Sequence, residues 1–273
     1  MHRRTFLSLT AASAAAVGAG ASWSRFIEPG YFELTHTRIR LVGTPPRRIL
    51  HISDIHISDG MNAADLETGF RQGLSQKPDL ICLTGDFVST ISGFDRQGLL
   101  RLLRSAVATA PTYAVLGNHD GGAWLARWGG GRSTEFMRDL IGSSGVHLLH
   151  NQSTVIDGLT LVGVADYWSG EFAPEQAFAG TPRTTARILL CHNPDAKRDL
   201  GHLHWDLMLS GHTHGGQVRV PGLTPLWAPV ADKRFIAGLY GWENRQLFIT
   251  RGVGSPKHVR AFCRPEISVL DLV

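Results

Sequence analysis

The chain has 273 residues, of which 43% are hydrophobic and 18% are charged, with 27 Lys and Arg against 23 Asp and Glu. This composition excludes a disordered chain, and a net charge of +4 is too small to indicate a nucleic-acid partner. No internal apolar run approaches the roughly 20 residues that a membrane-spanning helix needs, so a multi-pass membrane protein is excluded as well.

The first 21 residues have the layout of an export signal. Arg3 and Arg4 precede a short, weakly apolar stretch that ends in Ala19-Gly20-Ala21, a typical cleavage pattern. The arginine pair followed by Thr5-Phe6-Leu7 resembles the twin-arginine signal, whose machinery exports proteins that have already folded. A general secretory signal and an amphipathic first helix are the alternatives. The pattern leaves open whether the signal is cleaved or is retained as a tether.

We divide the chain into a signal at residues 1–21, a linker at 22–34 and one domain at 35–273. Within the domain, short apolar runs bounded by turn residues predict strands, and a hairpin over residues 154–164 is expected to turn at Asp157-Gly158. The other strands are expected at residues 35–41, 48–52, 80–83, 113–116, 188–191, 207–209, 217–220, 238–240, 246–250 and 267–270.

Helices are expected between these strands. Apolar residues four apart predict an amphipathic helix within residues 62–76, with Asn62 as its cap. Asp95 is expected to cap a second helix, and a third is expected over residues 133–141. The alternation of strands and helices predicts an α/β fold, a four-layer α/β/β/α sandwich of two mixed sheets flanked by helices.

The three cysteines show no disulfide framework and no metal-binding pair. Cys82 and Cys191 lie in apolar, strand-like runs, where a buried free thiol is expected, and Cys263 is left over.

Polar side chains follow five of the buried strands, at the point where each strand ends. Ligands of an α/β protein gather at the carboxyl ends of its strands, so we expect these side chains to meet. A spacing of two residues, as in Asp54 and His56, points both side chains to one side of an extended segment. The five strand ends are Ser53-Asp54-Ile55-His56, Gly85-Asp86, Gly117-Asn118-His119-Asp120, Cys191-His192-Asn193 and Gly211-His212-Thr213-His214-Gly215-Gly216.

The motifs D-x-H, G-D, G-N-H-D, H-N and G-H-T-H-G-G follow one another in this order along the chain. Together they resemble the calcineurin-like metallophosphoesterase family over residues 49–218. The sequences around them, including His192-Asn193-Pro194-Asp195, residues 211–217 and Arg251-Gly252, are similar to the exported, twin-arginine branch of that family.

The resemblance implies two divalent metal ions, Mn, Zn or Fe, bound at the carboxyl ends of the strands. A hydroxide that bridges the two ions would attack phosphorus. Seven oxygen and nitrogen donors are too many for one ion but suit two ions that share a carboxylate. The implied ligands are Asp54, His56 and His214 for the first ion and Asn118, His192 and His212 for the second, with Asp86 shared by both.

His119 is similar to the family's catalytic histidine, which stabilises the phosphoryl group or protonates the leaving oxygen. Asp120 is expected either to orient the His119 ring or to cap a turn, and Asn193 to support the site or to cap. Trp124 and Trp128 are candidates for lining a substrate pocket or contacting lipid.

Arg132 is a candidate for a phosphate contact. His51 is expected in the core or supporting the site, and five other histidines outside the motifs are expected at the surface or at strand ends. Those histidines are His147, His150, His202, His204 and His258.

We therefore expect an exported phosphoesterase in the periplasm or cell envelope that hydrolyses phosphodiester or diphosphate bonds. Envelope lipid or lipid-precursor headgroups are the favoured substrates, because no large capping domain interrupts the motifs. Hydrolysis of a UDP-acyl-sugar diphosphate is the main alternative, and a non-catalytic metal-binding scaffold or a metal carrier is the remote one. The expected partners are a small-molecule or lipid phosphoester and the twin-arginine machinery, with peripheral membrane contact possible and no nucleic acid.

Overall fold

The computed structural model describes residues 18–58, 61–182, 184–225 and 227–273. The greater part of the predicted signal, residues 1–17 with Arg3 and Arg4, lies outside the described residues. Residues 18–26 form a helix, followed by the short 3-10 turn η1 (Glu28–Gly30). The segment expected as a linker thus holds the end of this helix, η1 and the first residues of a strand. Among the described residues, no helix has the length and apolar character needed to cross a membrane.

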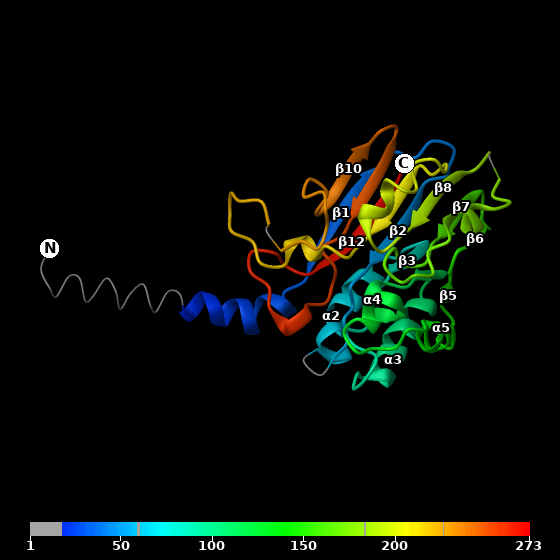
Figure 1. The fold of residues 1–273 in the computed structure, drawn as a ribbon. Helices are drawn as coiled ribbons and strands as arrows, with labels where there is room; N and C mark the ends of the chain where they lie inside the picture. Colours follow the sequence, from blue (N-terminus) through cyan, green and yellow to red (C-terminus); the bar gives the residue numbers. More distant parts are fainter. Residues whose placement is uncertain (1–17, 59–60, 183, 226) are drawn as a thin grey trace, which may run out of the picture.

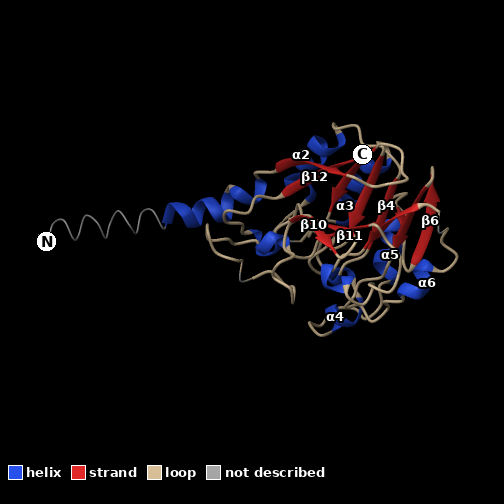
Figure 2. Ribbon diagram, turned by 90° about the horizontal axis from the view of Figure 1, so that it is seen from above, coloured by secondary structure: helices blue, strands red, loops and turns tan. Residues whose placement is uncertain are grey.

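Within these residues, two six-stranded sheets are stacked against each other (Figures 1 and 2). One sheet has the order β1-β12-β2-β3-β4-β5 and the other has the order β10-β11-β9-β8-β7-β6. The strands are β1 (Glu33–Ile39), β2 (Arg47–Ile52), β3 (Leu80–Thr84), β4 (Thr112–Val115), β5 (His147–Leu148), β6 (Gln152–Ile156), β7 (Leu159–Gly163), β8 (Ala186–Leu190), β9 (Leu207–Ser210), β10 (Gly238–Trp242), β11 (Arg245–Ile249) and β12 (Glu266–Leu272).

Parallel pairing dominates the middle of each sheet. Strands β2 to β5 are parallel in the first sheet, as are β7, β8, β9 and β11 in the second, whereas β12, β6 and β10 each have an antiparallel neighbour. Both sheets are therefore mixed, as predicted. Within each sheet the carboxyl ends of the parallel strands share an edge, and the loops beyond these ends carry the polar motifs.

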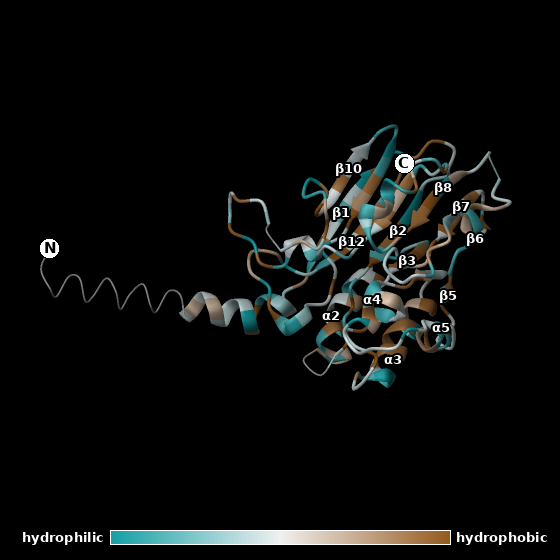
Figure 3. Cartoon of the chain, viewed as in Figure 1, coloured by the Kyte–Doolittle hydropathy of each residue, from teal (hydrophilic) through white to brown (hydrophobic). Residues whose placement is uncertain are grey.

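Helices cover the outer faces of the sandwich. Apolar side chains of α2, α3 and α5 form one buried cluster with the first sheet, and α6 belongs to the cluster on the outer face of the second. In Figure 3 the central strands are predominantly hydrophobic. The predicted four-layer arrangement is confirmed, although the outer layer on the second sheet consists of short elements. The helices are α2 (Ala63–Leu74), α3 (Arg96–Val107), α4 (Gly122–Ala126), α5 (Glu135–Gly142) and α6 (Pro174–Phe178), with the 3-10 turns η2 (Asn118–Asp120), η3 (Pro194–Lys197), η4 (His214–Gly216) and η5 (Pro256–His258).

The alternation of side chains along each strand builds the core. Leu161 of β7 faces the layer between the sheets, whereas its neighbour Val162 faces the outer cluster. The layer between the sheets contains a large apolar cluster that includes Cys82 of β3. Cys82, Cys191 and Cys263 are all free and buried, and burial raises the pKa of the Cys82 and Cys191 thiols.

The local signals for helix starts and for the hairpin are confirmed. The Asn62 side chain accepts hydrogen bonds from the main-chain nitrogens of Ala64 and Asp65, and Asp95 caps α3 in the same way. Strands β6 and β7 pair across the Asp157-Gly158 turn. The predicted strand at 217–220 is wrong, because only Val218 makes a bridge, to Ala261, and the segment is otherwise a loop.

Candidate metal centre

Five residues of the polar motifs have a left-handed backbone conformation, which is uncommon for residues other than glycine. Each loop turns sharply beyond its strand, and this turn brings its side chain into the site. Backbone strain of this kind clusters at functional sites, where the surrounding structure holds it in place. The five φ angles are 53° at Asp54, 52° at His56, 54° at Asp86, 69° at His212 and 49° at His214.

The Gly85-Asp86 loop fits tightly against the loop that follows β4. Gly85 has a φ of +85°, and a Cβ atom there would lie 2.4 Å from the main-chain nitrogen of Gly117. This close approach lets the main-chain nitrogen of His119 donate a hydrogen bond of 2.9 Å to Oδ1 of Asp86. Glycine is therefore needed before Asp86 for both steric and conformational reasons.

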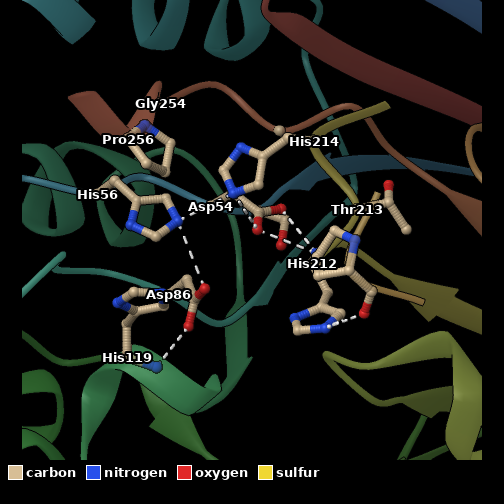
Figure 4. Close-up of polar contacts among 12 residues, drawn as sticks. Asp54, His56, Asp86, His119, His212, Thr213, His214, Gly254 and Pro256 are labelled. Atoms are coloured by element: carbon tan, nitrogen blue, oxygen red, sulfur yellow. Dashed lines mark hydrogen bonds and ion pairs between the residues drawn. The ribbon is translucent and has the colours of Figure 1, made fainter. Parts of the chain in front are cut away.

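The first group of possible metal ligands consists of Asp54, His56, Asp86 and His214, all buried, with ligand atoms within 4.8 Å of one another. Nε2 of His56 lies 3.4 Å from Oδ2 of Asp86 and 3.1 Å from Nε2 of His214. Nε2 of His214 lies 3.4 Å from Oδ1 of Asp54. Figure 4 shows these side chains converging on one point.

Asp86 also belongs to the second group, together with His192 and His212. Nε2 of His192 lies 3.2 Å from Oδ2 of Asp86 and 3.2 Å from Nδ1 of His212. Asn118 precedes His119, and its side-chain oxygen is buried without a hydrogen-bond partner among the described residues. The structure thus gathers the six predicted Asp and His ligands in two groups that share Asp86, with Asn118 beside them, although the individual ligand roles stay predictions.

The protonation of the second group shows why it suits a cation. Nδ1 of His192 lies 2.6 Å from the carbonyl of Thr84, and Nε2 of His212 lies 3.0 Å from the carbonyl of Pro229. A carbonyl only accepts, so each of these nitrogens carries the hydrogen. The other two ring nitrogens, Nε2 of His192 and Nδ1 of His212, lie 3.2 Å apart. Burial lowers the pKa of His192, but the neighbouring carboxylate of Asp86 outweighs burial and raises it to about 10, so Nε2 carries the ring's second proton when no cation is bound. A bound cation would take the place of this proton between His192, His212 and Asp86, and the donor set fits two divalent ions.

Electrostatics agree with this assignment. Burial lowers the pKa of His212 to about 3 and also lowers that of His214, so both rings are neutral donors at neutral pH. Burial raises the pKa of Asp86, but His192 and His119 outweigh burial and bring it well below its usual range. Asp86 is therefore ionised, as a shared metal ligand must be.

His119 is held by a main-chain carbonyl. Its Nδ1 lies 2.8 Å from the carbonyl of Ser89, which fixes the hydrogen on Nδ1 and leaves Nε2 available. The ring lies edge-on to His56 with 5.0 Å between ring centroids, and its centroid lies 4.5 Å from that of Trp124. Burial lowers the pKa of His119.

Asp120 does not orient the His119 ring, so that hypothesis is wrong. One carboxylate oxygen accepts from the main-chain nitrogens of Phe87 and Val88, and the other accepts from that of Gly117. Asp120 thus ties together the loops after β3 and β4. Asn193 likewise has the capping role, because its side chain accepts from the main-chain nitrogen of Asp195 in η3.

A cleft of about 510 Å³ opens beside His119. Trp124 and Trp128 line it together with Leu125 and Gly129, as one sequence hypothesis proposed, whereas Arg132 is exposed and does not line it. Trp168 is stacked on Trp124, with 6.5 Å between ring centroids, and packs edge-on to His212.

Several residues of the site were missed by the sequence reasoning. Ser89 holds His119, and its hydroxyl lies 3.3 Å from Nδ1 of His56. Asp166 is buried beyond the end of β7, and one of its oxygens has no hydrogen-bond partner among the described residues. The rule that found the other strand ends could have found Asp166. Nothing in the sequence marks Ser89 or Trp168, because they act through a main-chain carbonyl and a packing contact.

The other histidines lie as expected. His51 is buried, with its Nε2 2.8 Å from the hydroxyl of Thr84, whose carbonyl contacts His192. It therefore has both of the roles that the sequence left open, in the core and in support of the site. His147, His202 and His204 are exposed, and His150 and His258 are half-buried.

The comparisons with known proteins agree with this geometry. The family model of the calcineurin-like phosphoesterases matches residues 47–216. The chain is 38% identical to phosphodiesterase YaeI of Escherichia coli K12 over all of both chains, and 30% identical to the uncharacterized metallophosphoesterase YkuE of Bacillus subtilis, covering all of this chain and 98% of YkuE. It is 28% identical to UDP-2,3-diacylglucosamine pyrophosphatase LpxG of Chlamydia muridarum, covering 97% of this chain and 96% of LpxG.

Proposed function

The chain belongs to the calcineurin-like phosphoesterase family, and from that premise we propose an exported hydrolase that cleaves phosphodiester or diphosphate bonds in envelope lipids or their precursors. Family membership makes the chain a metal-dependent phosphoesterase with a binuclear site. The observation that carries the proposal is the pair of buried Asp and His groups that share Asp86. Two such groups match the two-ion arrangement that clamps a phosphoryl group.

Divalent cations bound to these groups lower the pKa of water and neutralise the charge of the phosphoryl oxygens. Asp54, His56 and His214 would hold one ion, and Asn118, His192 and His212 would hold the other, with Asp86 between them. Thr84 and Pro229 fix the tautomers of His192 and His212, so both rings present a lone pair to the ion without rearrangement.

His119 is the group that would move a proton. Ser89 holds one hydrogen on Nδ1, so Nε2 is the ring atom left for the reaction. In the protonated ring, Nε2 would donate to the phosphoryl group or give its proton to the leaving oxygen, which leaves the neutral ring with its hydrogen on Nδ1. Its ring packs against His56 and Trp124, between the ligand cluster and the cleft. A leaving group in the cleft would therefore depart next to Nε2.

Two relatives support the choice of bond. One is named a phosphodiesterase, and another is named a pyrophosphatase of a diacylated nucleotide sugar. The largely apolar lining of the cleft, with Trp124, Leu125 and Trp128, suits a substrate with an apolar portion. Hydrolysis of a UDP-acyl-sugar diphosphate is the second candidate, and it is favoured by the same cleft.

Export by the twin-arginine route to the periplasm or envelope is part of the proposal. It is supported by Arg3, Arg4 and the Ala-Gly-Ala pattern at residue 21. Replacing both arginines with lysine should block export, which fractionation of cells would show. Normal export of that variant would contradict the twin-arginine route.

Two variants test the catalytic proposal on bis(p-nitrophenyl) phosphate, with metal content measured on the same samples. His119→Ala should retain its metal and lose activity by about 10²- to 10⁴-fold, because only the proton-transfer group is removed. Asp86→Ala should lose both metal and activity, because both groups lose their shared carboxylate. Full activity of His119→Ala would remove His119 from the mechanism, and a metal-loaded wild-type protein without turnover would indicate a scaffold or metal carrier.

A further inference from the structure

Three segments that are distant in sequence lie side by side next to the metal centre. They are residues 18–31, residues 217–225 with Trp227, and residues 255–264, which together we call the docking face. The main-chain nitrogen of Arg260 donates to the carbonyl of Ser24, and that of Arg219 donates to the carbonyl of Ala261. The loop that carries Leu223 projects away from the sheets on the side of the N-terminal helix (Figure 1).

The docking face concentrates the exposed apolar side chains of the molecule. Among the described residues, fifteen large hydrophobic side chains are exposed, and nine of them belong to these three segments. Scattered exposed apolar residues need no explanation, but a contiguous patch indicates an interaction surface. The nine residues are Trp23, Phe26, Ile27, Tyr31, Val218, Val220, Leu223, Trp227 and Phe262.

The charge of the docking face has one sign. Its one acidic residue in the described chain, Glu28, is buried, and its carboxylate accepts from the main-chain nitrogen of Cys263. Lys233 lines the groove between Val220 and Phe262 and extends the basic surface, whereas the neighbouring Arg234 is paired with Asp232. The basic residues of the three segments that are at least partly exposed are Arg25, Arg219, Lys257 and Arg264, whereas Arg260 is fully buried.

The apolar side chains are held outward by a rigid base. Phe262 is 72% exposed although its φ is 51°, a conformation that an aromatic residue rarely adopts. Beneath it, the buried guanidinium of Arg260 donates to the carbonyls of Gly252, Gly254 and Cys263. These bonds hold the 255–264 segment, from which the side chain of Phe262 is exposed.

We propose that the docking face binds the surface of an anionic phospholipid bilayer. Exposed aromatic and aliphatic side chains enter the headgroup region, and surrounding Lys and Arg are attracted to anionic lipids. A second copy of the chain fits less well, because a symmetric dimer would bring this basic face against itself.

Docking would place the metal centre at the membrane surface. The second segment of the docking face begins at Gln217, three residues after His214, and the sulfur of Cys263 in the third segment lies 3.3 Å from the carbonyl of His214. A lipid headgroup could reach the site without leaving the bilayer. This consequence rests on the proposed lipid substrate, whereas binding to the bilayer itself does not.

A fluorescent probe attached at position 223 tests the contact. The three native cysteines are buried, so Leu223→Cys provides the accessible thiol for an environment-sensitive dye such as NBD. Vesicles of phosphatidylcholine and phosphatidylglycerol should shift the NBD emission to the blue, and high salt should reverse the shift. The matched control is Val155→Cys, which is 51% exposed on β6, away from the docking face, and should show no shift. No shift at position 223, or equal shifts at both positions, would overturn the proposal.

Vesicle sedimentation of the full chain gives a second readout. Arg219→Glu and Phe262→Ser should each weaken binding by about tenfold, whereas Arg71→Glu on α2 should not. All three variants should hydrolyse bis(p-nitrophenyl) phosphate like the wild type, which separates failure of docking from failure of the proposed activity. Unchanged vesicle binding by both Arg219→Glu and Phe262→Ser would contradict a bilayer as the occupant. So would a dimer of the wild type that these two substitutions dissociate while vesicle binding stays the same.

Discussion

The layer between the two sheets and the metal centre at its edge are buried to a similar extent, but they are built from opposite kinds of side chain. The layer contains Leu161, Ile188 and other apolar residues, for which burial is favourable. The metal centre contains carboxylates and imidazoles, for which burial is costly. Its loops are strained as well, with left-handed residues such as Asp54 and His214. The first region thus stabilises the fold, and the second is maintained by that stability and by a bound cation.

Removal of the metal ions should have the largest effect. A chelator should abolish hydrolysis of a phosphodiester, by more than about 10³-fold, because the donor groups alone cannot activate water. It should also lower the melting temperature, since ligand present at about a thousand times its dissociation constant contributes about 4 kcal/mol. Calorimetry with and without chelator measures this. An unchanged melting temperature would mean that no bound metal ion stabilises the folded chain.

Leu161→Ala tests the apolar layer between the sheets rather than the metal centre. Leu161 is fully buried between the sheets, so the substitution leaves a cavity and should cost about 2–5 kcal/mol of unfolding free energy. Denaturant titration measures the loss. Metal stoichiometry and activity should stay at wild-type values at temperatures where the variant is folded. Loss of metal from folded Leu161→Ala would show that the two regions are coupled.

His51 lies between the two regions and should give the smallest effect. Burial lowers the pKa of His51 from 6.5 to about 3, so between these values the unfolded chain binds a proton that the folded chain does not. The contribution to stability is therefore complete above pH 6.5 and is lost progressively as the pH falls toward 3. His51→Gln has no such group to titrate. Between pH 7 and pH 4 its free energy of unfolding should therefore fall by about 3 kcal/mol less than that of the wild type. The other histidines are common to both proteins and cancel in the difference, so parallel curves would contradict this account.

Periodicity and capping chemistry are local properties, and the sequence revealed them. Leu66 and Phe70 marked the buried face of α2, Asn62 marked its start, and Asp157-Gly158 marked the turn between β6 and β7. Short elements such as α4 and α6 were missed because five residues give too little pattern for a period to appear. The strand expected at 217–220 failed for a related reason, because an alternating sequence also suits a loop that leaves its apolar residues exposed.

By itself the sequence determined which side chains lie at the strand ends, since the chemistry of Asp, Asn and His at the ends of apolar runs can be read in order along the chain. Only the tertiary structure decided how these side chains meet. The distance of 3.2 Å between His192 and His212, the carbonyl of Ser89 on His119 and the contact of Trp168 with His212 depend on loops from both sheets. The exposed docking face was equally hidden, because an apolar residue in a sequence does not show whether another layer will cover it.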